Sequence, residues 1–413
     1  MVGRLGGPQC IQYRTVLAES TGKKAVGRRM EIGIPKEIMN SEFRVAAVPA
    51  GVNTLVKADH RVFVEQGAGS GSNIDDAEFA AAGAVLVPGA REVFARAEMI
   101  IKVKEPLPAE YEYLRTGQIL FTYLHLAPRP ELTEFLCRRK INGIGYETVQ
   151  LADGSLPLLT PMSQVAGRMA VQVGARYLEK TNGGAGVLLG GVPGVDPGRV
   201  TIIGPGVVGT NATRVALAMG ADVTLIGTNM ERLARLDELY GGRMTTLVSN
   251  EYNISRQVAD SDLVVGAALI PGGRAPKLVT GDMVSRMRPG SVIVDVAIDQ
   301  GGCVETSRVT SHAEPTFTVD GVIHYGVANM PGAVPRTSTF ALTNVTLPFA
   351  LEIADKGLDR ALRENASLRK GLNVYDGMIV QPNVAGSQGK EWRDPFRDAD
   401  SGGEQTGMGS AER

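Results

Sequence analysis

Runs of apolar residues alternate with helix-forming stretches through most of the chain, and this alternation predicts an α/β fold. In the first third, short runs rich in Val, Ile and Phe flank an alanine-rich stretch near Asp76–Ala82 that favours a helix. Strands separated by helices are typical of a mostly parallel sheet with helices on both faces. The predicted strands are Met30–Pro35, Arg61–Glu65, Met99–Lys104 and Gln118–Tyr123.

A second α/β region follows a helix and a glycine-rich loop. Apolar residues recur at spacings of three and four from Met162 to Tyr177, which predicts a helix that starts near Ser163. After the loop, Val200–Arg232 has the pattern of a strand, a glycine turn, a helix and a second strand. A further apolar helix is expected from about Ser338, after which the chain has too few residues for a third domain and should return to the first.

The length of 413 residues is too great for one ordinary core and favours two domains. We therefore predict an α/β protein with two Rossmann-like domains with parallel sheets, joined by hinge helices with a cleft between them. Residues 30–157 and 336–386 should form a substrate-binding catalytic domain, and residues 158–335 a dinucleotide-binding domain. Residues 1–29, with six basic residues and one acid, are expected to be a disordered extension, and residues 387–413 a flexible tail.

Composition excludes several classes of protein. The net charge of −1 argues against nucleic acid as a partner, because neutralising phosphates needs a basic surface. The three cysteines stand too far apart for a zinc site or a disulfide scaffold, which indicates a cytoplasmic protein without a metal. No apolar stretch approaches the roughly 20 residues that span a bilayer, so we expect no membrane partner.

The glycine turn carries the clearest signal for a ligand. Gly204, Gly206 and Gly209 lie between a Val/Ile strand and a helix, with a second strand at the expected distance. Such glycines allow a tight turn and bring a pyrophosphate close to backbone N–H groups at the start of the helix. Val207 and Val208, which complete the turn, are included in the predicted dinucleotide site.

The second strand of this unit lacks a carboxylate where chains that select NAD usually have one. It ends in Gly227, and the neutral residues Thr228 and Asn229 follow, with Arg232 close behind. A carboxylate at this place accepts the ribose hydroxyls and repels a 2′-phosphate. We therefore predict NAD(H) or NADP(H) as cofactor and slightly favour NADP(H). The alternative is that Arg232 lies over the adenine or ribose of NAD.

Candidate catalytic residues follow predicted strands. Lys102 and Lys104 end one strand, His125 follows the next, and Asp299 ends the apolar run Ser291–Asp299. Carboxyl ends of strands are where open α/β sheets bind ligands. Taken singly, two such lysines are often solvated and such a histidine often belongs to the core. Together they provide cations for a substrate carboxylate and an imidazole for proton transfer.

From Met30 to about Val384 the chain resembles NAD-dependent alanine dehydrogenases. This family shares ancestry with the NAD-binding subunit of proton-translocating transhydrogenase. The blocks that carry the resemblance are GIPKE (33–37), RVA (44–46), KVKEP (102–106), FTYLHLA (121–127), YETVQ (146–150), PLLTPMSQVAGRMA (157–170), VDVAIDQGG (294–302) and VANMPGAVPRTST (327–339). A departure is Gln164, where related enzymes usually carry Glu, and nothing in the sequence explains it.

The resemblance implies a role for each matching residue. Arg44 and Lys104 are expected to bind the substrate carboxylate and carbonyl, His125 to act as acid and base, and Asp299 to assist it. Lys102 is then a bystander or a supporting group. Further dinucleotide contacts are expected at Ser163, Leu269 and Asn329.

The implied reaction is the reversible oxidative deamination of L-alanine to pyruvate and ammonia by a homohexamer. Two alternatives stay open. One is reductive amination of another small 2-oxo acid, and the other is a non-catalytic, transhydrogenase-like NAD-binding subunit.

Overall fold

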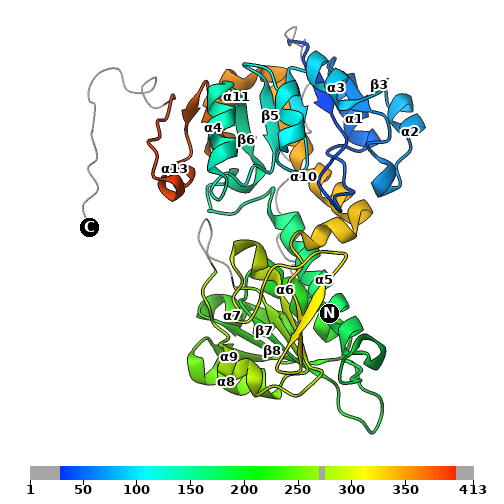
Figure 1. The fold of residues 1–413 in the computed structure, drawn as a ribbon, viewed down its shortest axis with the longest axis vertical. Coiled ribbons are helices and arrows are strands. Elements are labelled where there is room, and N and C mark those ends of the chain that lie inside the picture. Colours follow the sequence, from blue (N-terminus) through cyan, green and yellow to red (C-terminus); the bar gives the residue numbers. More distant parts are fainter. Residues whose placement is uncertain (1–27, 269–274, 397–413) are drawn as a thin grey trace, which may run out of the picture.

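Two α/β units are joined by two long helices in the computed structural model, which describes residues 28–268 and 275–396 (Figure 1). One unit combines the beginning and the end of the described chain, and the other is built from its middle. The predicted α/β class with two Rossmann-like units is confirmed.

The first unit contains an eight-stranded sheet in the order β15-β14-β6-β5-β4-β1-β2-β3. The six strands from β6 to β3 are parallel, and the chain winds outward from the centre in both directions, so the strand order reverses between β1 and β4. Ligands bind beside such a reversal, at the carboxyl ends of the strands. The strands are β1 (Glu31–Ile34), β2 (Arg61–Glu65), β3 (Val85–Val87), β4 (Met99–Ile101), β5 (Ile119–Thr122), β6 (Asn142–Gly145), β14 (Leu372–Tyr375) and β15 (Met378–Ile379).

The second unit repeats this plan in a seven-stranded sheet, with the order β12-β13-β11-β10-β7-β8-β9. All neighbours are parallel except β12 and β13, and the strand order reverses between β7 and β10. The central strands are buried along their whole length. The strands are β7 (Arg199–Ile203), β8 (Asp222–Gly227), β9 (Thr245–Val248), β10 (Leu263–Gly266), β11 (Val292–Asp295), β12 (Thr316–Val319) and β13 (Val322–Tyr325).

Helices cover both sheets, and two of them connect the units in Figure 1. The connecting helices are α5 (Thr160–Leu178) and α10 (Pro335–Lys356), and each begins about three residues before the predicted start because a proline fits its first turn. The others are α1 (Pro49–Lys57), α2 (Asp76–Ala81), α3 (Ala90–Arg96), α4 (Pro130–Arg138), α6 (Val207–Ala218), α7 (Met230–Tyr240), α8 (Glu251–Asp260), α9 (Gly281–Ser285), α11 (Leu358–Glu364), α12 (Ala366–Lys370) and α13 (Pro382–Gln388).

Antiparallel hairpins at one edge of each sheet complete the predicted mostly parallel arrangement. Strands β14 and β15 are joined by Asp376-Gly377, and strands β12 and β13 by Asp320-Gly321. All four turn residues have positive φ, from 42° at Asp376 to 88° at Gly377. A two-residue type I′ turn needs this backbone and favours Asp-Gly, so the same local chemistry forms both edges.

Two predicted strands end earlier than expected. Strand β4 stops at Ile101, so Lys102 and Lys104 lie beyond it, where the N–H of Val103 donates to the Glu37 carboxylate at 2.6 Å. Strand β11 stops at Asp295, and Asp299 lies in the 3₁₀ turn η5 (Val296–Gln300). At both strand ends a carboxylate accepts a backbone hydrogen bond, and Asp295 accepts from the Ala297 N–H at 3.2 Å.

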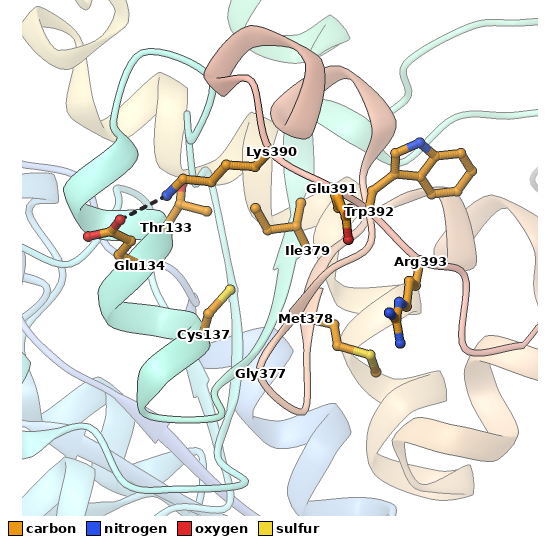
Figure 2. Close-up of a pocket in the computed structure, with 10 residues that line it drawn as sticks. All are labelled: Thr133, Glu134, Cys137, Gly377, Met378, Ile379, Lys390, Glu391, Trp392 and Arg393. Carbon is orange, nitrogen blue, oxygen red and sulfur yellow. Dashed lines mark hydrogen bonds and ion pairs between the residues drawn. The ribbon is translucent and has the colours of Figure 1, made fainter. Parts of the chain in front are cut away.

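The prediction of a flexible tail is wrong for its first ten residues, 387–396. These residues pack on the first unit. The Phe396 side chain is 3% exposed and lies against the Tyr375 ring. Gln388 donates to the Leu126 carbonyl at 2.7 Å, and Figure 2 shows Lys390 directed at Glu134, with 3.1 Å between the charged groups. A single aromatic ring and a few polar contacts thus hold a segment that looks too polar to order itself. The rest of this tail and residues 1–27 lie outside the described residues.

Close packing of α5 on α6 fixes the start of the helix that follows the glycine turn. A Cβ atom added to Gly167 of α5 would stand 2.2 Å from the Val208 carbonyl oxygen in α6. We expect Gly167→Ala to lower the free energy of unfolding by about 1–3 kcal/mol, because a backbone atom cannot yield as a side chain can. Urea denaturation measures this change.

Gly386→Ala provides the matched control in α13, where an added Cβ atom would meet no atom within 4 Å. Its helix should gain up to about 1 kcal/mol from the higher helix propensity of alanine. Equal stability of Gly167→Ala and the wild type would contradict the close approach of the two helices.

Candidate active site

His125 is held in an unusual backbone conformation three residues after β5. Its φ of 47° lies in the left-handed region, which histidine tolerates better than most residues. The Glu147 carboxylate accepts the N–H of His125 at 2.7 Å and that of Leu124 at 3.2 Å. The imidazole stacks on the Tyr123 ring, with 5.7 Å between the centroids. Glu147 and Tyr123 therefore fix the direction of the imidazole.

The surroundings of His125 keep its imidazole neutral. Burial, together with the positive charges of Lys104, Arg129 and Arg44, lowers its pKa from 6.5 to about 3. A neutral imidazole has a free lone pair and can accept a proton. His125 thus has the protonation state that a general base needs.

The two lysines of the KVKEP block lie in different environments. Lys102 is fully buried, with its Nζ 2.7 Å from Glu110 and 3.2 Å from Glu37. Burial acts to lower the pKa of Lys102, but these two carboxylates raise it, so the ammonium stays charged. Lys104 is partly exposed and acts electrostatically on both His125 and Asp299. The alternative of two solvated lysines is therefore wrong for Lys102, which supports the loop from within.

Arg44 forms a buried network that crosses between the two units. Its guanidinium makes two hydrogen bonds to the Glu42 carboxylate, one of them 2.7 Å from Nε to Oε1. It also donates to Asn329 Oδ1 at 2.8 Å, and Asn329 Nδ2 donates to Glu42 at 2.9 Å. The remaining guanidinium nitrogen, Nη1, lies 3.0 Å from the Met162 sulfur. The predicted substrate arginine is thus oriented by a carboxylate that the sequence analysis missed.

Asp299 lies at the same junction, on the side of the second unit. Asp299 is an exposed residue, yet desolvation by the surrounding protein atoms raises its pKa. Lys104, the N–H of Asn329 at 3.5 Å and Arg44 act in the opposite direction. The structure therefore brings Arg44, Lys104, His125 and Asp299 together from four separate loops.

The glycine turn has the backbone approach that a pyrophosphate requires. Gly206 precedes α6 and faces open space, because an added Cβ atom would meet no atom within 4 Å. At Gly209 the same atom would stand 1.8 Å from the Gly204 carbonyl oxygen, so only glycine lets the helix start this close to β7. Val207 and Val208 form the first turn of α6 and are partly exposed. The turn fits the phosphate-binding role that its sequence predicts.

The remaining predicted dinucleotide residues surround this turn. Ser163 lies one turn before Gly167 on α5, on the face that packs against α6. Gly227 ends β8, Thr228 is exposed, and the Asn229 side chain caps α7 by accepting the Arg232 N–H at 2.9 Å. The Arg232 side chain is exposed. Asn329 precedes the 3₁₀ turn η6 (Met330–Ala333), and Leu269 lies outside the described residues.

The Alanine dehydrogenase/PNT, N-terminal domain family matches residues 33–166, and the Alanine dehydrogenase/PNT, C-terminal domain family matches residues 170–382. The chain belongs to the alanine dehydrogenase/PNT family. It is 61% identical over 357 residues to an alanine dehydrogenase of Methanococcus maripaludis, which covers 86% of this chain and 96% of that protein. The predicted family resemblance is confirmed.

Solved structures support the same assignment. An L-alanine dehydrogenase structure is 55% identical, covers 87% of this chain and 99% of its own, and superposes with a TM-score of 0.85. A transhydrogenase from Sinorhizobium meliloti is 24% identical, covers 85% of this chain and 99% of its own, and has a TM-score of 0.73, which shows a shared fold only.

Several supporting residues of this family member escaped the sequence analysis, although most belong to the quoted blocks. They are Glu37, Glu42, Glu105, Arg129 and Glu147. Glu105 is buried and pairs with Arg129 at 2.7 Å, while its second carboxylate oxygen has no hydrogen-bond partner in the described protein. For Glu37, Glu105 and Glu147 a signal was available, because each is a charged residue inside one of the quoted sequence blocks. Within the described ranges, no group of three or more His, Cys, Asp or Glu side chains could hold a metal ion.

Glu147 offers a test of how His125 is positioned. We expect Glu147→Ala to lower kcat by about 10- to 100-fold, because the two backbone N–H groups lose their acceptor and the imidazole loses its direction. Glu147→Gln keeps an amide oxygen at the same place and should retain most of the activity. Steady-state kinetics of both variants measure the effect, and equal losses would contradict a purely positioning role.

The low pKa of His125 predicts a pH dependence of stability. Between pH 6.5 and about 3 the unfolded chain binds a proton at His125 that the folded protein does not. The contribution of His125 to the free energy of unfolding is therefore fully present above pH 6.5. It is lost as the pH falls, by at most about 1.4 kcal/mol per pH unit. In His125→Asn, whose asparagine tolerates left-handed backbone, urea denaturation should show a shallower loss. Parallel pH profiles of the two proteins would refute the lowered pKa.

Proposed function

We propose that the protein is an alanine dehydrogenase that catalyses the reversible oxidative deamination of L-alanine to pyruvate and ammonia. The observation that carries this proposal is the assembly of two cationic side chains, Arg44 and Lys104, around the neutral imidazole of His125. The high identity to alanine dehydrogenases over most of the chain supports the same reaction. The enzyme is an oxidoreductase that depends on a nicotinamide dinucleotide.

Arg44 and Lys104 would hold the substrate. A carboxylate pairs well with a guanidinium, and Lys104 is a second cation close to the same site. Because Glu42 and Asn329 already hold Nε and Nη2 of Arg44, a bound carboxylate would meet Nη1 and have one defined direction. Such orientation of the reacting carbon is worth several orders of magnitude in rate.

His125 would take up and return the protons of the reaction. Its pKa is low partly because three cations surround it, so the negative charge of a bound carboxylate would raise this pKa toward neutrality. The imidazole then becomes a stronger base when substrate is present. Asp299, with its raised pKa, is the candidate to assist His125 from the second unit.

The dinucleotide would lie along the carboxyl end of the second sheet. Gly204, Gly206, Val207, Val208 and Gly209 would hold its pyrophosphate, with Ser163, Leu269 and Asn329 as further contacts. When bound, its nicotinamide ring accepts a hydride from the substrate or returns one. Every proton step remains with the side chains described above.

We propose NADP(H) as the preferred cofactor. Gly227 places no negative charge beside the adenosine ribose, and Thr228 and Asn229 are neutral. The exposed side chain of Arg232 can pair with a 2′-phosphate. In the alternative, in which NAD(H) is preferred, Arg232 lies over the adenine or ribose instead.

The organisation of the chain follows from these roles. We propose that residues 30–157 and 336–386 form the substrate domain, that residues 158–335 form the dinucleotide domain, and that α5 and α10 act as the hinge.

By its family the enzyme would be a homohexamer, and its widely spaced cysteines favour the cytoplasm. Within residues 28–268 and 275–396, no helix is long and apolar enough to cross a membrane.

Of the two alternatives, a non-catalytic subunit like that of transhydrogenase is not favoured, because such a subunit has no use for the acid and base groups near Arg44. Reductive amination of a larger 2-oxo acid is also less favoured, given the identity to alanine dehydrogenases.

Steady-state reductive amination tests the proposal with a panel of 2-oxo acids, each assayed with NADH and with NADPH. We expect pyruvate to give the highest kcat/KM of the panel and NADPH to be used better than NADH. His125→Asn should lose at least about 100-fold in kcat while it still binds dinucleotide, because it lacks the proton acceptor. Fluorescence titration with the reduced dinucleotide provides the control. Near wild-type turnover in this variant would overturn the role of His125.

A further inference from the structure

The space beside Gly227 is already filled. A Cβ atom added to this residue would stand 2.5 Å from both Cδ and Cγ of Pro205, the second residue of the glycine turn. Carbon atoms in contact normally lie about 3.5–4.0 Å apart. Because the proline ring is closed through its own backbone nitrogen, its carbons cannot swing away as a flexible side chain would. Glycine at position 227 is therefore required by proline at position 205.

Neither partner of this contact is free to move. The N–H of Gly204, next to Pro205, donates to the Ile226 carbonyl oxygen at 2.8 Å, which ties the turn to the end of β8. On the other side, the N–H of Ser249 donates to the Gly227 carbonyl oxygen at 2.9 Å, which ties β8 to the end of β9. Relief of a clash at position 227 would therefore strain these hydrogen bonds.

Removal of the ring would open the space. The third nearest atom to the added Cβ is Pro205 Cβ, at 3.4 Å, which is at the short end of ordinary contact. An alanine at position 205 keeps only this carbon, so it accommodates a side chain at position 227. The identity of residue 205 thus decides whether a carboxylate can stand at the end of β8.

We propose that Pro205 is a specificity-determining residue of the dinucleotide site. Its ring excludes any side chain at position 227, and with it the carboxylate that would accept the ribose hydroxyls of NAD and repel a 2′-phosphate. The ligand class that this arrangement admits is an adenine dinucleotide with a phosphate on the adenosine ribose. This inference rests on the proposed NADP(H) preference and adds its physical cause, the contact between Pro205 and Gly227.

The charge around position 227 agrees with this ligand class. In the segment Thr228–Arg232 the carboxylate of Glu231 balances the guanidinium of Arg232, so the segment is neutral overall. All five of its residues are exposed. A carboxylate at position 227 would make the region negative, whereas glycine leaves Arg232 available to a phosphate.

The test is a set of six proteins: the wild type, Gly227→Ala, Gly227→Asp, Pro205→Ala and the two double variants. Thermal unfolding measures the steric contact without any cofactor. We expect each single change at position 227 to lower Tm by roughly 2–8 °C, and Pro205→Ala to restore most of that loss in the double variants. Gly227→Ala is the control that carries the added carbon without the charge.

Kinetics of reductive amination of pyruvate with NADH and NADPH measure the selectivity of the same proteins. Gly227→Asp alone should use both dinucleotides poorly, because the displaced turn holds neither. The double variant Pro205→Ala with Gly227→Asp should move the ratio of kcat/KM toward NADH by at least about 10-fold relative to the wild type, since the carboxylate repels the 2′-phosphate.

The two measurements separate the possible failures. If both single variants at position 227 keep the wild-type Tm, Pro205 does not exclude side chains and the inference is overturned. If Gly227→Asp alone already switches to NADH with full activity, it is overturned as well. If the wild type prefers NADH but Pro205→Ala still restores the Tm lost by a change at position 227, the proposed NADP(H) preference fails. The steric exclusion of side chains at position 227 by Pro205 then still stands.

Discussion

The arrangement of the site depends on the buried ion pair between Glu42 and Arg44 and on the amide that completes it. Both charges are removed from water, and Asn329 of the second unit supplies a donor to one and an acceptor to the other. Loss of one partner from such a buried pair costs about 3–5 kcal/mol. The same residue donates its backbone N–H to Asp299. One asparagine therefore sets the position of the loop that carries Arg44 relative to the loop that carries Asp299.

Electrostatics make the chemistry of this site dependent on its ligand. Burial, and after it the charges of three cations, lowers the pKa of His125 and keeps its imidazole neutral. A bound substrate carboxylate would cancel part of the positive charge and make the imidazole a better proton acceptor. Lys102 contributes differently, because its pairing with Glu37 and Glu110 holds the backbone from which Lys104 projects. In the proposed mechanism, substrate binding and the base strength of His125 would thereby be coupled.

Much of this protein could be predicted from local patterns in the sequence. The strands, the glycine turn and the loops with His125 and Asp299 follow from runs of apolar residues and from what succeeds them. The two Asp-Gly hairpins were missed although their turn chemistry was visible, because the strands beside the turns are only two to four residues long. The burial of Lys102 and the contact between Pro205 and Gly227 could not be predicted. Both join residues distant in the chain, and only the folded sheet shows which atoms meet.

The return of the last strands to the first sheet has a consequence for the order of folding during synthesis. The second sheet uses a continuous stretch of chain, so it can form as soon as β13 has left the ribosome. The first sheet starts earlier but stays unfinished, since β6 gains its neighbour only when Leu372–Tyr375 emerges. Until then the edge formed by Asn142–Gly145 is open to pairing with other chains. The unit made first is therefore completed last, and its open edge can mispair during synthesis.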